Sequence, residues 1–223
     1  MTRRPHRCTP VTGPRHTPGT PREHDDHAME RVKQSEVVDI AAYEKIRPAF
    51  RARVLADKER RRLGVGPAFT FLFENHLSVL YQVQEMMRTE RIVDAQAIAH
   101  ELETYNELIP PEGGLGATLL IEYTDPAQRD AALTRLVGLE RHVRLEVGSL
   151  PPVAGRFDTR QMSEDKLSAV QYLTFPLGEE QRRAWREEGG AGRIRLVVEH
   201  PHYAHGAVLP PPLAVALAKD LGV

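Results

Sequence analysis

Ionisable and amide side chains recur in residues 71–110 at positions that helical periodicity would otherwise give to apolar groups. A repeat of 3.6 residues per turn predicts two helices here, joined by the short link Val93-Asp94 and therefore packed side by side as a helical hairpin. Arg88 and Glu90 fall on or beside apolar stripes, so we expect both to be partly buried. Because a buried charge needs a partner, this hairpin is the first candidate for a site.

Two interpretations of these charges are open. Glu101 of the second helix pairs with Arg88 or Arg91 of the first in a purely structural ion pair. Alternatively, Glu85, Glu90 and Glu101 ligate a metal, although the Glu-x-x-His spacing of di-iron bundles does not occur here.

A second group of candidate ligands follows the last predicted strand, in the segment EHPHYAH. His200, His202 and His205 with Glu199 offer imidazole nitrogens and a carboxylate, which suit iron, manganese or zinc. The spacing matches no established zinc signature, so a surface loop with solvated histidines is the alternative. His200 and Tyr203 as a general acid–base pair is a further option.

Arg60, Arg61 and Arg62 end a predicted helix that begins at Pro48, where cations favour the helix dipole. A cluster of this kind at a helix end is usually solvated, and the more specific interpretation is a phosphate or nucleotide site. The glycine-rich segment 113–116 precedes a strand, which is the wrong context for a dinucleotide fingerprint, and neither Gly-x-Ser-x-Gly nor His-Glu-x-x-His occurs. The sequence therefore leaves open whether the protein is an enzyme.

The 223 residues include 30 Lys and Arg against 31 Asp and Glu, so the formal net charge is −1. This balance gives no basic field for nucleic acid, and no apolar run is long enough to span a membrane. Cys8 is the only cysteine, which excludes an internal disulfide and a self-ligated iron–sulfur cluster. We expect a soluble, cytoplasmic protein that binds neither nucleic acid nor membranes.

Residues 1–28 have a different composition, with five prolines, four of the ten histidines and few large apolar side chains. Such a segment cannot bury a core, so we expect a disordered tail, with Met29 as the true start of translation. Residues 29–223 are expected to form a single α+β domain, with a helical part at 37–110 and a sheet part at 115–223.

Downstream of the hairpin, short β-rich runs alternate with helical patterns. Strands are predicted at 117–123, 142–147, 153–157, 168–175 and 193–200, and helices at 126–137, 179–187 and 211–221. This order favours an α+β fold in which the N-terminal helices, the hairpin included, pack on a mostly antiparallel five-stranded sheet with additional helices.

Several segments resemble a bacterial family, the domain-of-unknown-function family 3501, over about Val37 to Leu221. They are YEKIRP (43–48), LFEN (72–75), QVQEMMRTERI (82–92), ELETYNELIP (101–110), SAVQY (168–172) and HPHYAH (200–205). The positions that the resemblance singles out are Glu74, Gln84, Glu85, Arg88, Glu90, Glu101, Tyr105, Asn106, His200, Tyr203 and His205. Because His202 lies outside the pattern, His200 and His205 are the favoured metal ligands.

Members of this family are often encoded beside rubrerythrin-like proteins and iron–sulfur oxidoreductases. The resemblance therefore implies an accessory protein that binds such a partner in an oxidative-stress or iron-linked redox system. A metal-dependent enzyme is the first alternative, with Glu85, Glu90 and Glu101 joined to His200 and His205 around iron, manganese or zinc. A nucleotide or small-anion binder that uses Arg60–Arg62 is the second.

Overall fold

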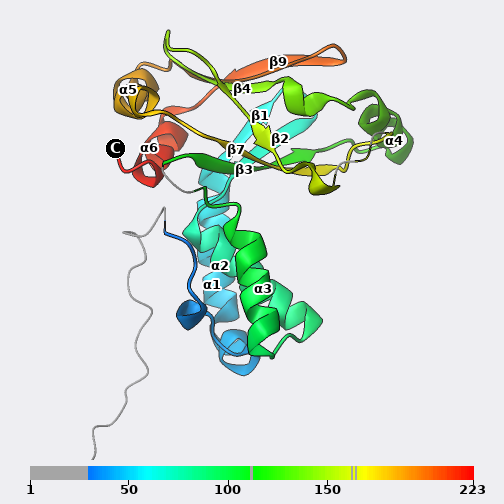
Figure 1. The fold of residues 1–223 in the computed structure, drawn as a ribbon, viewed down its shortest axis with the longest axis vertical. Coiled ribbons are helices and arrows are strands. Elements are labelled where there is room, and N and C mark those ends of the chain that lie inside the picture. Colours follow the sequence, from blue (N-terminus) through cyan, green and yellow to red (C-terminus); the bar gives the residue numbers. More distant parts are fainter. Residues whose placement is uncertain (1–29, 111–112, 162, 164) are drawn as a thin grey trace, which may run out of the picture.

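The computed structural model describes residues 30–110, 113–161, 163 and 165–223. The disordered tail predicted for residues 1–28 lies outside these ranges. Within them, two antiparallel sheets are stacked above a layer of helices, as Figure 1 shows. The predicted α+β class is confirmed, and so is the packing of N-terminal helices on a five-stranded antiparallel sheet.

The five-stranded sheet is the middle layer and has the order β1-β2-β3-β7-β6. Its strands are β1 (Arg62–Val65), β2 (Phe69–Phe73), β3 (Leu115–Ile121), β7 (Val170–Phe175) and β6 (Arg156–Phe157). The four-stranded sheet has the order β5-β4-β8-β9. Its strands are β5 (Val153–Ala154), β4 (Val143–Val147), β8 (Ile194–His200) and β9 (Tyr203–Val208).

The main core lies between the two sheets, because alternate residues of each strand point toward the other sheet. Phe69, Phe71 and Phe73 of β2 meet Leu145 of β4 in this core. The Tyr203 ring stacks on Phe69 with 3.8 Å between the ring centroids.

Three helices form the layer on the opposite face of the five-stranded sheet (Figure 1). They are α1 (Ile40–Arg60), α2 (His76–Glu90) and α3 (Ala95–Asn106). Each begins at a side-chain cap, in which Asp39, Asn75 or Asp94 accepts a hydrogen bond from a backbone N–H of the first turn. The predicted cap Asp94 and the short link between α2 and α3 are confirmed.

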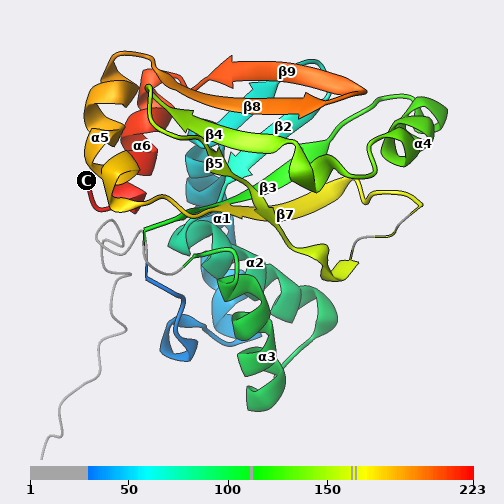
Figure 2. The ribbon, with the colours of Figure 1, turned by 45° about the horizontal axis from the view of Figure 1, so that its top comes forward.

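The remaining helices close the ends of the two-sheet sandwich. Figure 2 shows α5 (Glu179–Gly190) and α6 (Pro211–Asp220) at one end and α4 (Pro126–Arg135) at the other. Short 3-10 helices lie at Gln34–Glu36, Leu139–Arg141 and Thr159–Gln161. No helix of the described ranges is long and apolar enough to cross a membrane.

The structure differs from the predicted elements in two ways. First, α1 begins at Ile40 and not at Pro48, because Asp39 provides the cap and Pro48 sits at an exposed interior position of the helix. Second, the strands form two sheets, and β1, β2 and β9 were not predicted. The predicted strand 153–157 is in fact two short strands, β5 and β6, which belong to different sheets because the chain passes from one to the other at Gly155. Residues 71–73 belong to β2 and not to the helical hairpin, since a strand covered on both faces lacks the alternation that marks a half-buried one.

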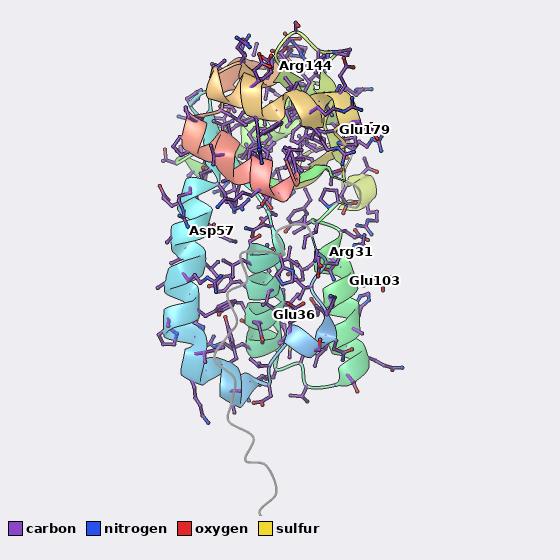
Figure 3. The ribbon with its side chains drawn as sticks, turned by 90° about the vertical axis from the view of Figure 1, so that its left-hand side faces the viewer. Arg31, Glu36, Asp57, Glu103, Arg144 and Glu179 are labelled. Carbon is purple, nitrogen blue, oxygen red and sulfur yellow. The ribbon has the colours of Figure 1, made fainter. Side chains whose placement is uncertain are left out.

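A buried ion-pair cluster fixes the helical layer to the rest of the fold. Arg61 donates from Nε to Asp57 Oδ2 at 2.9 Å and from Nη2 to Asp220 Oδ1 at 3.0 Å, and Asn75 Nδ2 donates to the same Asp57 oxygen. Figure 3 shows Asp57 toward the end of α1 that lies beneath α6. Because the Arg61 guanidinium is occupied by two carboxylates, it is not available for the phosphate site predicted at Arg60–Arg62.

Candidate functional site

A cleft of about 570 Å³ lies between α3 and the β6–β7 edge of the five-stranded sheet. This volume is within the range of small-molecule sites. The lining residues are Thr104, Tyr105, Glu107 and Leu108 from α3 and its C-terminal turn, Arg156, Phe157, Asp158 and Arg160 from β6 and the segment after it, and Tyr172, Leu173 and Thr174 from β7. We refer to this feature as the interlayer cleft.

Strand register places the polar groups of the sheet side by side in this cleft. Arg156 of β6 is paired with Thr174 of β7, and Tyr172 is paired with Thr118 of β3. Since side chains two residues apart share one face of a strand, Tyr172 and Thr174 lie on the same face, while Leu173 is buried on the face of the main core.

Two half-buried tyrosines, Tyr105 and Tyr172, line the cleft. Among the described residues, neither the Tyr105 nor the Tyr172 hydroxyl has a hydrogen-bond partner. Burial raises the pKa of Tyr172, and the Glu74 carboxylate raises it further. Burial also raises the pKa of Tyr105, with further contributions from Tyr172 and Glu101. Both phenols are therefore neutral at physiological pH and can each donate a hydrogen bond.

A buried carboxylate lies behind Tyr172. Glu74 is 6% exposed and accepts hydrogen bonds from Thr118 Oγ1 at 2.6 Å, Gln82 Nε2 at 3.2 Å and the Ser78 hydroxyl. All three donors are neutral, so hydrogen bonds hold this carboxylate without an ion pair to a described residue. Glu74 therefore contributes a fixed negative potential on one side of the cleft.

The rim of the cleft carries two arginines with different surroundings. Arg160 donates from Nε to Asp158 Oδ1 at 2.8 Å and from Nη1 to Glu107 Oε1 at 3.1 Å, so it joins the β6 side to the end of α3. Arg156 is exposed and forms no ion pair with any residue in the described part of the chain. Among the described residues that line the cleft, Arg156 is thus the cation without an ion pair.

Of the residues singled out by the sequence, Tyr105 lines this cleft, Glu74 is buried behind Tyr172, and Glu101 is half-buried near Tyr105. Gln84 and Asn106 are buried and bond the backbone of the segment that precedes α1. These two amides therefore dock a chain segment and do not face the cleft.

The charges of α2 pair with α1. Glu85 accepts from Tyr43 Oη at 2.7 Å and from Arg47 through Nε at 2.7 Å and Nη2 at 2.9 Å. Arg88 pairs with Glu44 at 2.5 Å, and not with Glu101. The expected partial burial of Glu90 is wrong, because α1 covers the other side of α2 and leaves Glu90 exposed.

The β8–β9 hairpin holds the histidines and Tyr203. Tyr203 Oη accepts from the backbone N–H groups of Ala68 and Phe69 at 3.0 and 3.1 Å and donates to Val65 O at 2.7 Å, which ties β9 to the β1–β2 turn. His200 is buried, while His205 is exposed and contacts the Tyr203 ring.

The glutamates of the helical hairpin α2–α3 and the histidines of the β8–β9 hairpin occupy different layers. Figure 1 shows α2 and α3 below the five-stranded sheet and β9 above it. The structure thus does not bring Glu85, Glu90 and Glu101 together with His200 and His205. Across the described residues, no group of three or more His, Cys, Asp or Glu side chains is arranged to hold a metal ion.

Most residues of the cleft were not predicted from the sequence. Its sheet side is built from Arg156, Thr174 and Tyr172, and its rim from Arg160 and Glu107. One signal was available: in the predicted strand 168–175, Tyr172 and Thr174 alternate with Leu173 and Phe175, which predicts a polar face at this strand. The partner β6 has two residues, too few for any periodicity.

The fold and this site define an α+β protein in which a helical layer packs on a two-sheet sandwich and leaves a ligand-sized cleft at their boundary. The chain belongs to the family described as "Protein of unknown function (DUF3501)", whose model matches residues 31–221, and the resemblance found in the sequence is confirmed.

A solved structure is similar to this chain. It is the crystal structure of a novel protein of unknown function from Burkholderia pseudomallei K96243, with 36% sequence identity and a TM-score of 0.79. The match covers 86% of this chain and 100% of that chain. No curated protein matches the sequence.

Proposed function

We propose that this protein is a binding protein and that its ligand is a small organic molecule held in the interlayer cleft. The observation that carries the proposal is that two half-buried tyrosines, Tyr105 and Tyr172, line the cleft and that their hydroxyls have no partner in the described chain. Neither oxygen is a buried unpaired atom, so both hydroxyls are accessible and free to donate a hydrogen bond to a ligand in the cleft.

The test is binding of neutral aromatic probes, phenol and 4-hydroxybenzamide, to the full chain by ligand-observed NMR. A Tyr105→Phe, Tyr172→Phe double variant removes both hydroxyls and keeps both rings. Two lost hydrogen bonds weaken binding by about tenfold or more, since each contributes about 1 kcal/mol. Tyr81→Phe is the matched control, because Tyr81 is half-buried on α2 and does not line the cleft.

Two results would contradict the proposal. One is the absence of binding by either probe. The other is equal affinity of the wild-type protein and the double variant, which would place the probe elsewhere on the protein.

An accessory role beside a rubrerythrin-like or iron–sulfur oxidoreductase partner is a separate proposal, supported by the family resemblance alone. It predicts that the full chain co-purifies with such a partner when both are produced together at native levels. Retention of that complex by the Tyr105→Phe, Tyr172→Phe variant would show that the partner surface and the cleft are independent.

A further inference from the structure

We infer that the interlayer cleft selects a monocarboxylate, that Arg156 binds the carboxylate, and that a second polar group of the ligand lies one aromatic ring away, at Tyr172. This inference rests on the proposed binding function and names the chemical class of its ligand.

The charges of the lining residues identify Arg156 as the anion-binding group. Arg160 is held between Glu107 and Asp158, so its charge is already compensated. Arg156 has no described carboxylate partner, although it lines the same cleft. A guanidinium presents parallel N–H donors that match the two oxygens of a carboxylate.

The neighbour of Arg156 adds a second donor at the same position. Thr174 is the register partner of Arg156 on β7, so the two side chains lie about 5 Å apart at their Cβ atoms. The Thr174 hydroxyl forms no hydrogen bond with a described residue. Guanidinium and hydroxyl can therefore converge on one carboxylate.

The strand also places the next donor on the same face. Tyr172 is two residues from Thr174 on the same strand face, which corresponds to about 7 Å along β7. That separation is close to the one between the two para substituents of a benzene ring. Leu108 lines the cleft as an apolar group that can cover such a ring.

The surrounding carboxylates argue against a dianion. Glu107 and Asp158 lie on the rim, and the buried Glu74 lies behind Tyr172. Against these three carboxylates stand two guanidiniums, those of Arg160 and Arg156, so a second negative charge on the ligand would meet a net negative surrounding, which disfavours phosphate relative to a carboxylate.

Isothermal titration calorimetry of the full chain tests the inference with 4-hydroxybenzoate, its neutral isostere 4-hydroxybenzamide, and inorganic phosphate. We expect the wild-type protein to prefer the benzoate, and Arg156→Gln to weaken benzoate binding at least tenfold while leaving amide binding unchanged. Arg156→Lys should restore part of the affinity. Arg186→Gln is the matched control, because Arg186 is an exposed arginine on α5 outside the cleft.

The outcomes separate this inference from the proposed function. If both aromatic probes bind equally and Arg156→Gln changes neither, the anion site is wrong while the binding function stands. Phosphate that binds more tightly than 4-hydroxybenzoate overturns the monocarboxylate class. If no aromatic probe binds at all, both proposals fail. Because Arg156 is exposed, unchanged thermal unfolding of Arg156→Gln is expected and shows that the fold is retained.

Discussion

The side chain of Asn106 forms hydrogen bonds with both backbone groups of Val32. Asn106 Oδ1 accepts from the Val32 N–H at 2.8 Å, and Asn106 Nδ2 donates to the Val32 carbonyl at 2.9 Å. Gln84 makes the same pair of bonds to Val38, at 2.8 and 3.1 Å. The two amides act like added backbone units, and they dock the segment that contains the 3-10 helix Gln34–Glu36 against α2 and α3 (Figure 3).

Asn106→Ala is expected to lower the free energy of unfolding by about 2 kcal/mol. It leaves a buried N–H and a buried carbonyl of Val32 unpaired, and each lost hydrogen bond costs about 1 kcal/mol or more. Urea unfolding measures the change, and hydrogen exchange should show faster exchange at Val32. Glu103→Ala, at an exposed position of the same helix, is the control. A loss no larger than that of the control would mean that the segment is docked by other contacts.

Gln84 and Asn106 show which features of the fold could be predicted from the sequence and which could not. The sequence places amide side chains at helix positions that periodicity would give to apolar groups, and two of them, Gln84 and Asn106, are buried in the structure. Their partners, Val38 and Val32, are 46 and 74 residues away, and such pairings leave no local pattern. The same limit applies to Glu85, whose partners Tyr43 and Arg47 lie on α1.

The strands that were not predicted escaped detection for a different physical reason. β2 is buried on both faces, so it lacks the period of two by which a strand is recognised. The segment after the last predicted strand is expected to be a loop, yet its pairing with β8 over Tyr203–Val208 makes it the regular strand β9. Strand register, which brings Arg156 beside Thr174, is a property of the assembled sheet, so the cleft could not be inferred from sequence.

Gly116 marks the closest approach of the α3 C-terminal turn to β3. A Cβ at this position would overlap the Leu108 carbonyl oxygen, a backbone atom that cannot rotate away. Gly116→Ala should therefore lower the free energy of unfolding by about 3 kcal/mol or more. Gly64→Ala is the matched control in β1, because a Cβ there meets nothing within 4 Å, and it should be neutral or slightly stabilising. Similar unfolding midpoints for the two variants would contradict this packing.

Glu85 should make stability depend on pH at the acid end. Hydrogen bonds from Arg47, followed by that from Tyr43, hold the pKa of the Glu85 carboxyl below its usual range despite its partial burial. Because the pKa is lower in the folded protein, the stabilisation is complete above the unfolded value of about 4.3 and is lost as the pH falls through the folded pKa. Glu85→Gln should remove this loss, so its unfolding free energy changes less between neutral and acid pH than that of the wild type.

Glu90→Gln is the control for this effect, since Glu90 lies on the same helix and is exposed. It should leave the acid limb of the stability curve unchanged. If the unfolding free energies of Glu85→Gln and Glu90→Gln fall equally as the pH is lowered, the Arg47–Glu85 pair contributes nothing measurable to stability.

His200 should add a second pH dependence, closer to neutrality. Its Nε2–H donates to the Val137 carbonyl at 3.3 Å and its Nδ1 accepts the His202 N–H at 3.2 Å, so the neutral ring is fully satisfied. Burial lowers the pKa of His200, and the nearby His142 and His202 lower it further. Protonation would place a proton on Nδ1 against the backbone N–H that it accepts.

Because the folded pKa of His200 lies below the unfolded value of about 6.5, the unfolded chain takes up this proton first as the pH falls. Stability is therefore retained above that value and declines as the pH falls toward the folded pKa. His200→Gln keeps one donor and one acceptor and should flatten this part of the curve, measured as urea midpoints from mildly alkaline to mildly acidic pH. His205→Gln, at the exposed histidine of β9, should not. An identical decline in wild-type protein and His200→Gln would assign the pH dependence to other groups and would leave His200 with a packing role only.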